Sequence, residues 1–560
     1  MSDRMHPIPF EALLDWILGE YRTEGSIFGV KKFWHAPEDS GQPFMGRNIE
    51  SVVGPAAGPH TQLAQNIVAA YLCGARVFEL KTVQVIDGAD LRVSKPCILA
   101  EDEGYNCEWS TELTVPQARD EYIKAWVLLH VLSKELDLGR ADGFVFCMSV
   151  GYDLTGIRSP KIDGFLDDMT DASNTDIFRH CHAVLARRLG DFKSFTSDDL
   201  AAISPNPCNN VTISTMHGCP AEDIEAIVCH LMENKGLHLL LKCNPTLVGF
   251  DHAKKVLDAQ GFNYLRFEQT SFDNDLQYSD AVPMLSRLQK RATALGLFFG
   301  VKLTNTFAVK ADHGELPDEN IYMSGRALLP LSLRVAAMLR KDFGDALPMS
   351  YCGGADAKNI ALLAKAGLFP ITVCTELLKP GGYEKLYPMA TALEEAKHAG
   401  VTPDAPFLGE LAKALCAPAK RIPSRHRAME LPAPDEKTDC RAVCGICASV
   451  CPNRANVIIT VDGKRQMLHL DGPCNECGNC ASFCAEKTLP YHNKLTVFTD
   501  GAALADSQNA GFAYLPESRR FLLRWEGACC EANPEDERVP PEIGRVMATV
   551  RDRYPWLLYR

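Results

Sequence analysis

The sequence predicts an α/β chain, in which a (β/α)8 barrel is followed by a small α+β domain. Three observations predict this fold. Short apolar runs alternate with amphipathic stretches about eight times between residues 51 and 378. A proline-rich stretch follows, and eight of the chain's 22 cysteines then fall between Cys440 and Cys484. A repeated strand–helix unit favours a closed parallel barrel over a doubly wound sheet.

The predicted barrel strands are apolar runs of five to seven residues. Residues 1–50 precede them as a helical extension, with a helix at about Pro9–Tyr21 and then a loop. The eight strands are Val52–Ala57, Val77–Thr82, Phe144–Val150, Val211–Thr215, Leu239–Cys243, Phe298–Thr304, Leu347–Cys352 and Ile371–Thr375. A weaker run, Tyr264–Phe267, fits either an inserted strand or a loop.

Amphipathic segments between these runs show the 3.6-residue apolar period of surface helices. They are Thr61–Cys73, Pro116–Lys134, Ala221–Asn234, Ser279–Leu295, Leu328–Lys341 and Ala357–Lys365. We therefore place the barrel at 51–400, with a long insertion at 154–205. Residues 401–439 read as a Pro-rich linker, 440–500 as the cysteine-rich domain, and 501–560 as an extension without an interpretable motif.

Composition excludes several functions. Basic residues number 58 and acidic ones 71, a net charge of −13, so non-specific nucleic-acid binding is not expected. No apolar run approaches the roughly 18 residues that a membrane span needs. The N-terminus lacks the basic start and cleavage site of a signal peptide. We expect a cytoplasmic protein. In that reducing compartment, so many cysteines are not expected to form disulfides.

The cysteine spacing is the strongest signal in the sequence. The pattern is Cys-x3-Cys-x2-Cys-x3-Cys-Pro from residue 440, then Cys-x2-Cys-x2-Cys-x3-Cys from residue 474. It resembles bacterial-type ferredoxin domains with two [4Fe–4S] clusters, in which the fourth cysteine of each run binds the other cluster. One cluster is then assigned Cys440, Cys444, Cys447 and Cys484, and the other Cys474, Cys477, Cys480 and Cys451. The first gap is one residue longer than usual, and Ala485 replaces the second proline.

Two alternatives for these cysteines were considered. Two structural zinc sites would show paired CxxC motifs rather than two quartets. The CxxxCxxC run at Cys440–Cys447 also matches the loop of radical enzymes that cleave S-adenosylmethionine. In those enzymes the loop follows the first strand of their own barrel, whereas here it follows a complete barrel.

Small and polar residues follow several predicted barrel strands, where the loops of such a barrel carry the chemistry. Short motifs at these places are KT (81–82), KxNP (242–245), TNT (304–306), SGR (324–326), GGAD (353–356) and CTEL (374–377). Their order resembles the FMN barrel of dihydroorotate and dihydropyrimidine dehydrogenases. A closer resemblance is to the family labelled as a selenate reductase subunit, proteins associated with purine catabolism. It runs through GPAAGPHTQLAQN, FELKTVQ, STMHGCP, VKLTNT and YMSGRAL.

The resemblance implies an FMN site. It places Lys81 and Lys242 near the flavin ring, and Asn305 and Thr306 toward the ring or substrate. Gly353 and Gly354, with the backbone near Thr375, would bind the phosphate, because backbone N–H groups there face an anion. Glu376 would be a poor neighbour for that anion unless its side chain turned away.

The catalytic proton donor is less clear in the sequence. In the pyrimidine-reducing relatives, a cysteine on a loop after the fourth strand exchanges a proton with the substrate. Cys219 is the nearest match, and His217 is the competing acid/base because its ordinary pKa lies near neutrality. A purely structural loop is the third alternative. Thr212 stands where those relatives have asparagine, so the identity of the substrate does not carry over.

Together these signals predict an oxidoreductase. Electrons would pass between two [4Fe–4S] clusters and FMN, and a C=C or C=N bond of a small pyrimidine- or purine-derived heterocycle would be reduced or oxidised. Larger relatives carry an FAD- and pyridine-nucleotide-binding domain. No strand–GxGxxG–helix element occurs here, so we expect a separate FAD/NAD(P)H-type or ferredoxin electron-transfer subunit; the oligomeric state stays open.

Two other functions were weighed. One is a non-catalytic electron-transfer subunit of a selenate reductase or a molybdenum hydroxylase. The other is a barrel that has lost FMN and serves only as a scaffold for the ferredoxin module.

Overall fold

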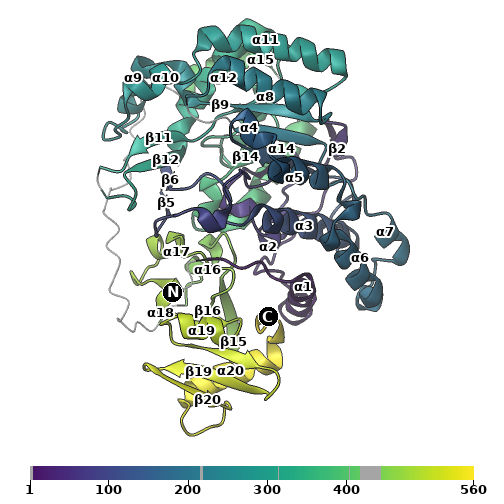
Figure 1. The fold of residues 1–560 in the computed structure, drawn as a ribbon, viewed down its shortest axis with the longest axis vertical. Helices are drawn as coiled ribbons and strands as arrows, with labels where there is room; N and C mark the ends of the chain where they lie inside the picture. Colours follow the sequence, from purple (N-terminus) through teal and green to yellow (C-terminus); the bar gives the residue numbers. More distant parts are fainter. Residues whose placement is uncertain are drawn as a thin grey trace.

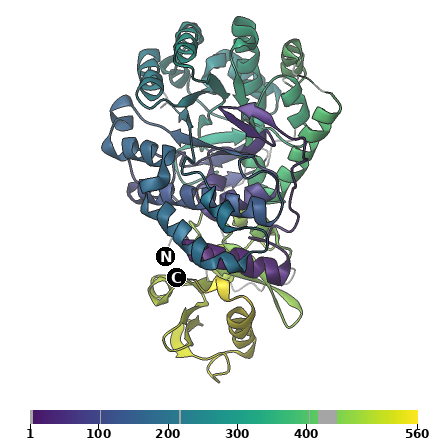
Figure 2. The same ribbon diagram turned by 90° about the vertical axis from the view of Figure 1, so that its right-hand side faces the viewer.

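The computed structural model describes residues 4–101, 103–214, 218–312, 314–400, 402, 404–415, 440 and 443–559. A large barrel occupies one end of the molecule, and a smaller sheet formed by the C-terminal residues occupies the other (Figures 1 and 2). The N-terminal helix α1 (Phe10–Glu24) lies between them. Its Trp16 ring stacks on Tyr559 at a centroid distance of 6.5 Å, so both ends of the chain help to join the two parts.

The barrel has eight parallel strands, and the predicted fold class is confirmed. They are β3 (Val53–Pro55), β4 (Val77–Glu79), β7 (Val145–Val150), β8 (Asn210–Ser214), β9 (His238–Cys243), β10 (Phe299–Leu303), β13 (Met349–Tyr351) and β14 (Ile371–Val373). Their spatial order is β3-β14-β13-β10-β9-β8-β7-β4. Each lies within one of the eight apolar runs or differs from it by a single residue.

The barrel closes where β3 meets β4. The Arg76 N–H donates to the Val53 carbonyl at 3.0 Å. A Cβ atom on Gly54 would lie 1.6 Å from the Val77 carbonyl oxygen. Only glycine permits so close a backbone approach, which explains the small residue at this position.

The predicted helices also form. They are α2 (Ala64–Leu72), α3 (Val115–Glu135), α8 (Ala221–Glu233), α11 (Tyr278–Leu295), α12 (Leu329–Phe343) and α13 (Ile360–Lys365). Helix α3 begins with a capping box, in which Thr114 and Gln117 satisfy each other's backbone N–H groups. None of the described helices is both long and apolar enough to span a bilayer.

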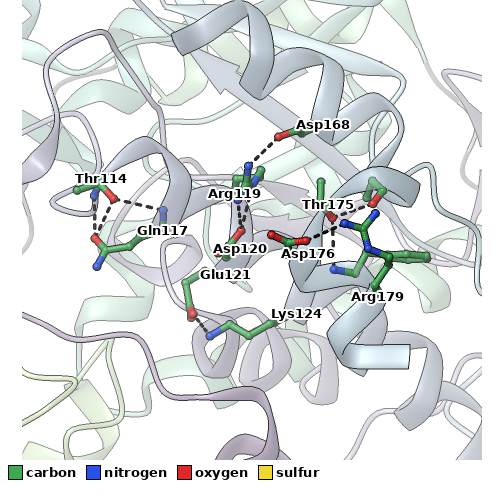
Figure 3. Close-up of polar contacts among 12 residues, drawn as sticks. Thr114, Gln117, Arg119, Asp120, Glu121, Lys124, Asp168, Thr175, Asp176 and Arg179 are labelled. Atoms are coloured by element: carbon green, nitrogen blue, oxygen red, sulfur yellow. Dashed lines mark hydrogen bonds and ion pairs between the residues drawn. The ribbon is translucent and has the colours of Figure 1, made fainter. Parts of the chain in front are cut away.

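The insertion between β7 and β8 is helical. It contains α4 (Leu154–Ile157), α5 (Pro160–Thr170), α6 (Asp176–Arg188) and α7 (Ser197–Ala201). Arg119 of α3 donates to Asp168 of α5 at 2.8 Å, and Figure 3 shows this pair beside the capped start of α6 at Thr175. The insertion is therefore fixed to the outer face of the barrel.

Two further elements lie at the ends of the barrel. The hairpin β1 (Gln42–Phe44) and β2 (Arg47–Ile49) packs Phe44 and Ile49 against Val77, Val145 and Leu240. An antiparallel sheet, absent from the sequence prediction, has the order β11-β12-β6-β5. Its strands are β5 (Ile98–Ala100), β6 (Glu103–Asn106), β11 (Phe307–Lys310) and β12 (Asn320–Gly325). Residues 264–267, the weaker ninth run, form a loop.

The C-terminal sheet has six strands in sequential order. They are β15 (Asn456–Val461), β16 (Lys464–Leu470), β17 (Leu495–Phe498), β18 (Gly511–Leu515), β19 (Arg520–Trp525) and β20 (Ala528–Ala532). The sheet runs across residue 500, where the sequence suggested a boundary, and α20 (Pro541–Arg553) follows it. Most of the module's cysteines lie on or beside the short helices α16 (Ile446–Val450) and α17 (Asn479–Ser482), and a third short helix, α18 (Pro490–Asn493), follows them.

The stretch expected to be a linker begins with a helix, α15 (Ala405–Leu415). Its remainder, residues 416–439, lies outside the described residues.

Candidate functional site

A pocket opens at the carboxyl ends of the barrel strands. Its empty space, including the opening to solvent, is about 1120 Å³. The residues assigned to cofactor binding from the sequence all line it: Lys81, Lys242, Asn305, Thr306, Gly353, Gly354 and Thr375. They follow five different strands, and parallel strands bring their carboxyl ends to one rim. This location is where ligands bind in barrels of this type.

Two lysines lie in the deep part of the pocket. Lys81 is 4% exposed, and burial lowers the pKa values of both Lys81 and Lys242. Within the described chain, neither ammonium group has a hydrogen bond or ion pair to a side chain. Lys81 is buried and Lys242 is partly buried, and cations in such positions favour an anionic or electron-rich ligand.

The opposite side of the pocket is a cradle of backbone and small residues. Gly353 and Gly354 have φ angles of +122° and +73°. A Cβ on Gly354 would lie 2.9 Å from the Leu329 Cβ, so no side chain fits there. The Thr375 and Ser324 hydroxyls lie 2.7 Å apart. This donor-rich rim suits a phosphate group.

Glu376 also lines the pocket, but its charge is neutralised. Its carboxylate pairs with Lys385 at 2.5 Å and with Lys379 at 3.2 Å. Burial alone would raise its pKa, but the two lysines outweigh that effect and lower it. The side chain therefore does not oppose an anion. Arg326, a cation that was not among the predicted site residues, also lines the pocket.

A buried ion pair inside the barrel escaped the sequence analysis. Lys302 pairs with Glu79, and it donates to Ser350 at 3.1 Å and to Thr372 at 2.5 Å. Burial would raise the pKa of Glu79, but Lys302 and Lys242 hold it below its ordinary value. The Glu79 carboxylate also accepts from the N–H of Ala57, a pocket residue, at 3.3 Å. The sequence signal that could have revealed this pair is the presence of two charged residues, Glu79 and Lys302, within otherwise apolar barrel strands.

Cys219 lies beside the main pocket rather than in it. It lines a small neighbouring cavity of about 290 Å³ with Lys242, Asn244 and Asp275. Lys242 lines both spaces. Burial, with the charges of nearby carboxylates, raises the pKa of the Cys219 thiol to about 11, so it is protonated at neutral pH. His217, the competing acid/base, lies outside the described residues.

Asp275 anchors the loop that carries Cys219, although no sequence motif marks this residue. It accepts from the Gly218 N–H at 2.6 Å, from Thr246 at 2.8 Å and from Asn244 at 3.1 Å. Asn305 in turn donates to Asn244 at 2.8 Å. A continuous hydrogen-bond network therefore connects the Cys219 loop with the main pocket.

The cysteine-rich module carries the eight cysteines that the spacing predicts to be cluster ligands. Burial raises the pKa of the Cys447 thiol to about 12, and the charge of Lys494 opposes this increase. The cysteine charges that act on Cys447 are those of Cys440, Cys484 and Cys444. Around Cys480, where burial again raises the pKa, the strongest cysteine charges come from Cys451, Cys477 and Cys474. The cysteine charges that act on these two thiols come mainly from their own predicted sets, although Cys447 also acts on Cys480.

Two of these sulfur atoms accept hydrogen bonds from the backbone. The Ala455 N–H donates to the Cys451 sulfur and the Glu476 N–H to the Cys474 sulfur, both at 3.3 Å. In the described part of the chain, no three His, Cys, Asp or Glu side chains converge as one metal ion would require. A four-iron cluster needs no such convergence, because each thiolate binds a different iron.

The module packs directly against the wall of the pocket. The carbonyl of Cys477 accepts from the N–H groups of Cys97 and Ile98, at 3.0 and 2.9 Å. Asn479 donates to the Leu378 carbonyl at 2.9 Å. Ile98 and Leu378 both line the pocket. A single layer of residues therefore separates the second cysteine set from the barrel site.

These features define a TIM-barrel protein with a ligand pocket at the carboxyl ends of its strands. A family model described as "Oxidoreductase YgfK, N-terminal TIM-barrel domain" matches residues 28–421. The chain belongs to this oxidoreductase family.

Two curated relatives agree with this assignment. The chain is 46% identical over 410 residues to "Putative oxidoreductase YgfK" of Escherichia coli strain K12 and to its counterpart in E. coli O157:H7. Each alignment covers 70% of this chain and 39% of the relative, so the chain spans well under half the length of the relatives it matches. The family assignment is coarser than the selenate reductase label, which stays a prediction.

Proposed function

We propose that the chain is an iron–sulfur flavoprotein oxidoreductase. Two [4Fe–4S] clusters in the cysteine-rich module would exchange electrons with FMN in the barrel pocket, which would reduce or oxidise a C=C or C=N bond of a small heterocycle. The observation that carries this proposal is the shared wall: Cys477, assigned to one cluster, is hydrogen-bonded to Ile98, which lines the pocket. Such close packing suits electron transfer between the two sites.

The pocket residues fit FMN by their chemistry. When bound, the flavin supplies one-electron exchange with the clusters and hydride exchange with the substrate. The ammonium groups of Lys81 and Lys242 would balance negative charge on the ring. The backbone at Gly353 and Gly354, with Arg326 nearby, would hold the phosphate.

The proton of the reaction is assigned to Cys219. Its raised pKa keeps a proton on the sulfur at neutral pH, as a general acid requires. The Asp275 network would hold the loop while the thiol turns toward the substrate. His217 stays the alternative donor.

A second candidate function follows from the same geometry. Cys219 does not line the main pocket, which favours a non-catalytic electron-transfer subunit over an enzyme that is complete in itself. In both cases a partner with an FAD/NAD(P)H site or a ferredoxin would supply or accept electrons.

The test begins with anaerobic assays of iron, sulfide and released flavin on the purified chain. About eight irons and one FMN per chain are expected from two four-iron clusters and one flavin site. Bleaching of the flavin by a heterocycle such as dihydrouracil would favour the enzyme, and bleaching only by reduced ferredoxin would favour the electron-transfer subunit. Eight irons without flavin, even after FMN is added, would overturn the proposal.

A further inference from the structure

Three charged side chains share the barrel interior beside the pocket. Glu79 of β4 pairs with Lys302 of β10, and these strands are not neighbours in the sheet, so the pair crosses the interior. Lys302 lies directly opposite Lys242 of β9 in the parallel register. Side chains at directly paired positions point to the same face of a sheet. Lys242 therefore also faces the interior, next to both members of the pair.

The Glu79–Lys302 pair is closed to solvent and held in place. Its side chains are 2% and 0% exposed. Lys302 also donates to Ser350 at 3.1 Å and to Thr372 at 2.5 Å, and Glu79 accepts from the Ala57 N–H at 3.3 Å. Because water does not screen these two fixed charges, each acts strongly on a neighbouring ammonium group.

Lys242 connects this pair with the pocket. Its side chain is partly buried and lines the pocket, whereas neither Glu79 nor Lys302 does. Among the charges that act on Lys242, that of Glu79 is the strongest and favours the ammonium form, and that of Lys302 follows and opposes it. The two members of the pair therefore have opposite effects on the same group.

The other ionisable side chains around Lys242 come from the pocket and from the small cavity beside it. They are Lys81, Cys352 and Cys374 in the pocket and Cys219 and Asp275 in the cavity. Burial raises the pKa values of all three thiols, so none of them is charged at neutral pH. The remaining charged residues of the pocket pair with one another, Arg326 with Asp356 and Glu376 with Lys379. On the other side of β9, β8 presents Ser214 to Lys242, and a hydroxyl group does not ionise in this range.

We propose that Glu79 and Lys302 are positioning residues of the flavin site, which set the charge of Lys242 and thereby the pH range in which the pocket binds FMN. The inference rests on the proposed function. Glu79 keeps the proton on Lys242, whereas Lys302 favours its release. Since neither residue lines the pocket, both act on the flavin through Lys242.

The test measures FMN affinity of the full chain by fluorescence titration across the neutral and alkaline pH range. It compares wild type, Glu79→Gln, Lys302→Met and the double variant. Val145→Ala is the matched control, because it loosens the packing of the barrel interior without changing its charge. Urea unfolding first establishes that each form is folded.

The two single variants should shift in opposite directions. Wild-type affinity falls as pH rises and Lys242 loses its proton. In Glu79→Gln this fall should occur about one pH unit lower, a tenfold change in proton binding, and in Lys302→Met about as much higher. The double variant should lie between the single variants and below wild type, because Glu79 has the stronger effect. In a Lys242→Gln background, Glu79→Gln should cause no shift.

Shifts of the same sign in both single variants, or no shift in either, would overturn the inference, since a merely structural pair has no reason to act in opposite directions. A shift in Val145→Ala as large as that in Glu79→Gln would also overturn it. If a single variant does not fold, the double variant decides, and a fall of affinity at or above the wild-type pH would overturn the inference. A wild-type chain that binds no FMN would instead overturn the proposed function, so the two failures are distinguishable.

Discussion

The backbone N–H of Ile98 donates a hydrogen bond to the carbonyl of Cys477, with an N–O distance of 2.9 Å. Ile98 belongs to β5, in the sheet next to the barrel mouth, and its side chain lines the pocket. Cys477 belongs to the second cysteine set. This bond connects parts of the chain nearly 400 residues apart, and it makes the pocket wall and the cysteine loop a single structural unit.

Replacement of Cys477 by serine should remove one cluster and leave the other. We expect iron to fall from about eight to about four atoms per chain, because each four-iron cluster needs its four ligands. FMN content should change little, since the pocket residues are untouched. Iron and flavin assays measure both. Cys529→Ser is the matched control, because Cys529 is exposed and outside both sets; an equal loss of iron there would contradict the assignment.

Gly478 is required for the contact between module and barrel. Its φ is +85°, and a Cβ there would lie 2.3 Å from the Cβ of Pro96. Gly463 has a similar φ of +76° but nothing within 4 Å. Both alanine variants carry the backbone strain of positive φ, about 1 kcal/mol, and only Gly478→Ala adds a clash. We expect slower electron transfer from reduced clusters to flavin in Gly478→Ala alone, measured by stopped-flow absorption. Equal rates in the two variants would show that the close contact between Gly478 and Pro96 is not needed for electron transfer.

Lys242 should contribute to flavin binding in a pH-dependent way. Lys242→Gln removes a partly buried cation, and we expect at least a tenfold weaker affinity for FMN, in line with the loss of about 1.5–3 kcal/mol for a charged contact. Burial lowers the Lys242 pKa below its ordinary value of 10.5. The ammonium is therefore lost as pH rises toward that value, and wild-type affinity should fall in the alkaline range.

Fluorescence titration with FMN at several pH values measures both effects. The control is Lys358→Gln, an exposed lysine near the same rim, which should bind FMN as the wild type does. An unchanged alkaline loss of affinity in Lys242→Gln would assign the pH dependence to another group.

The barrel could be read from the sequence because its strands are buried, apolar and separated by amphipathic helices. Val145–Val150, for example, is buried at every position. The sheet of β5, β6, β11 and β12 could not be read this way. Its strand Glu103–Asn106 has the sequence EGYN, with no alternating apolar pattern, and it pairs with a strand more than 200 residues away. Such strands are fixed by tertiary pairing rather than by local preference.

The residues of the candidate site also divide into those that could be predicted from the sequence and those that could not. Residues directly after strands, such as Lys81 and Asn305, could be placed because parallel strands share a rim. Asp275 could not, because it follows no barrel strand and reaches its partners only through the folded loop. The pairing of Glu79 with Lys302 crosses the barrel interior, where spacing along the chain gives no information about which charges meet.

The Glu79–Lys302 pair should stabilise the barrel only as a pair. Glu79→Gln leaves the Lys302 ammonium buried without a carboxylate, and breaking a buried pair in this way costs about 3–5 kcal/mol. The double variant Glu79→Gln/Lys302→Met removes both charges and should recover much of that loss. Equilibrium urea unfolding measures the three free energies. A double variant that is no more stable than Glu79→Gln would contradict this account.

His130 should make the barrel less stable in acid. It lies between Trp126 and Phe144, with ring centroids 4.5 and 5.3 Å away, and burial lowers its pKa from 6.5 to about 4. The unfolded chain therefore binds a proton below pH 6.5, whereas the folded chain binds it only below about pH 4. The free energy of unfolding falls as pH falls through this window.

Between pH 7.5 and 5.0 this loss of stability is about 2 kcal/mol. His130→Gln has no such imidazole and does not lose this stability in acid. The unfolding free energy of the wild type should therefore fall by about 2 kcal/mol relative to that of His130→Gln between pH 7.5 and 5.0. Urea unfolding followed by tryptophan fluorescence measures this change. The exposed control His398→Gln should show a constant difference at both pH values, and a constant difference for His130→Gln would exclude His130 as the source.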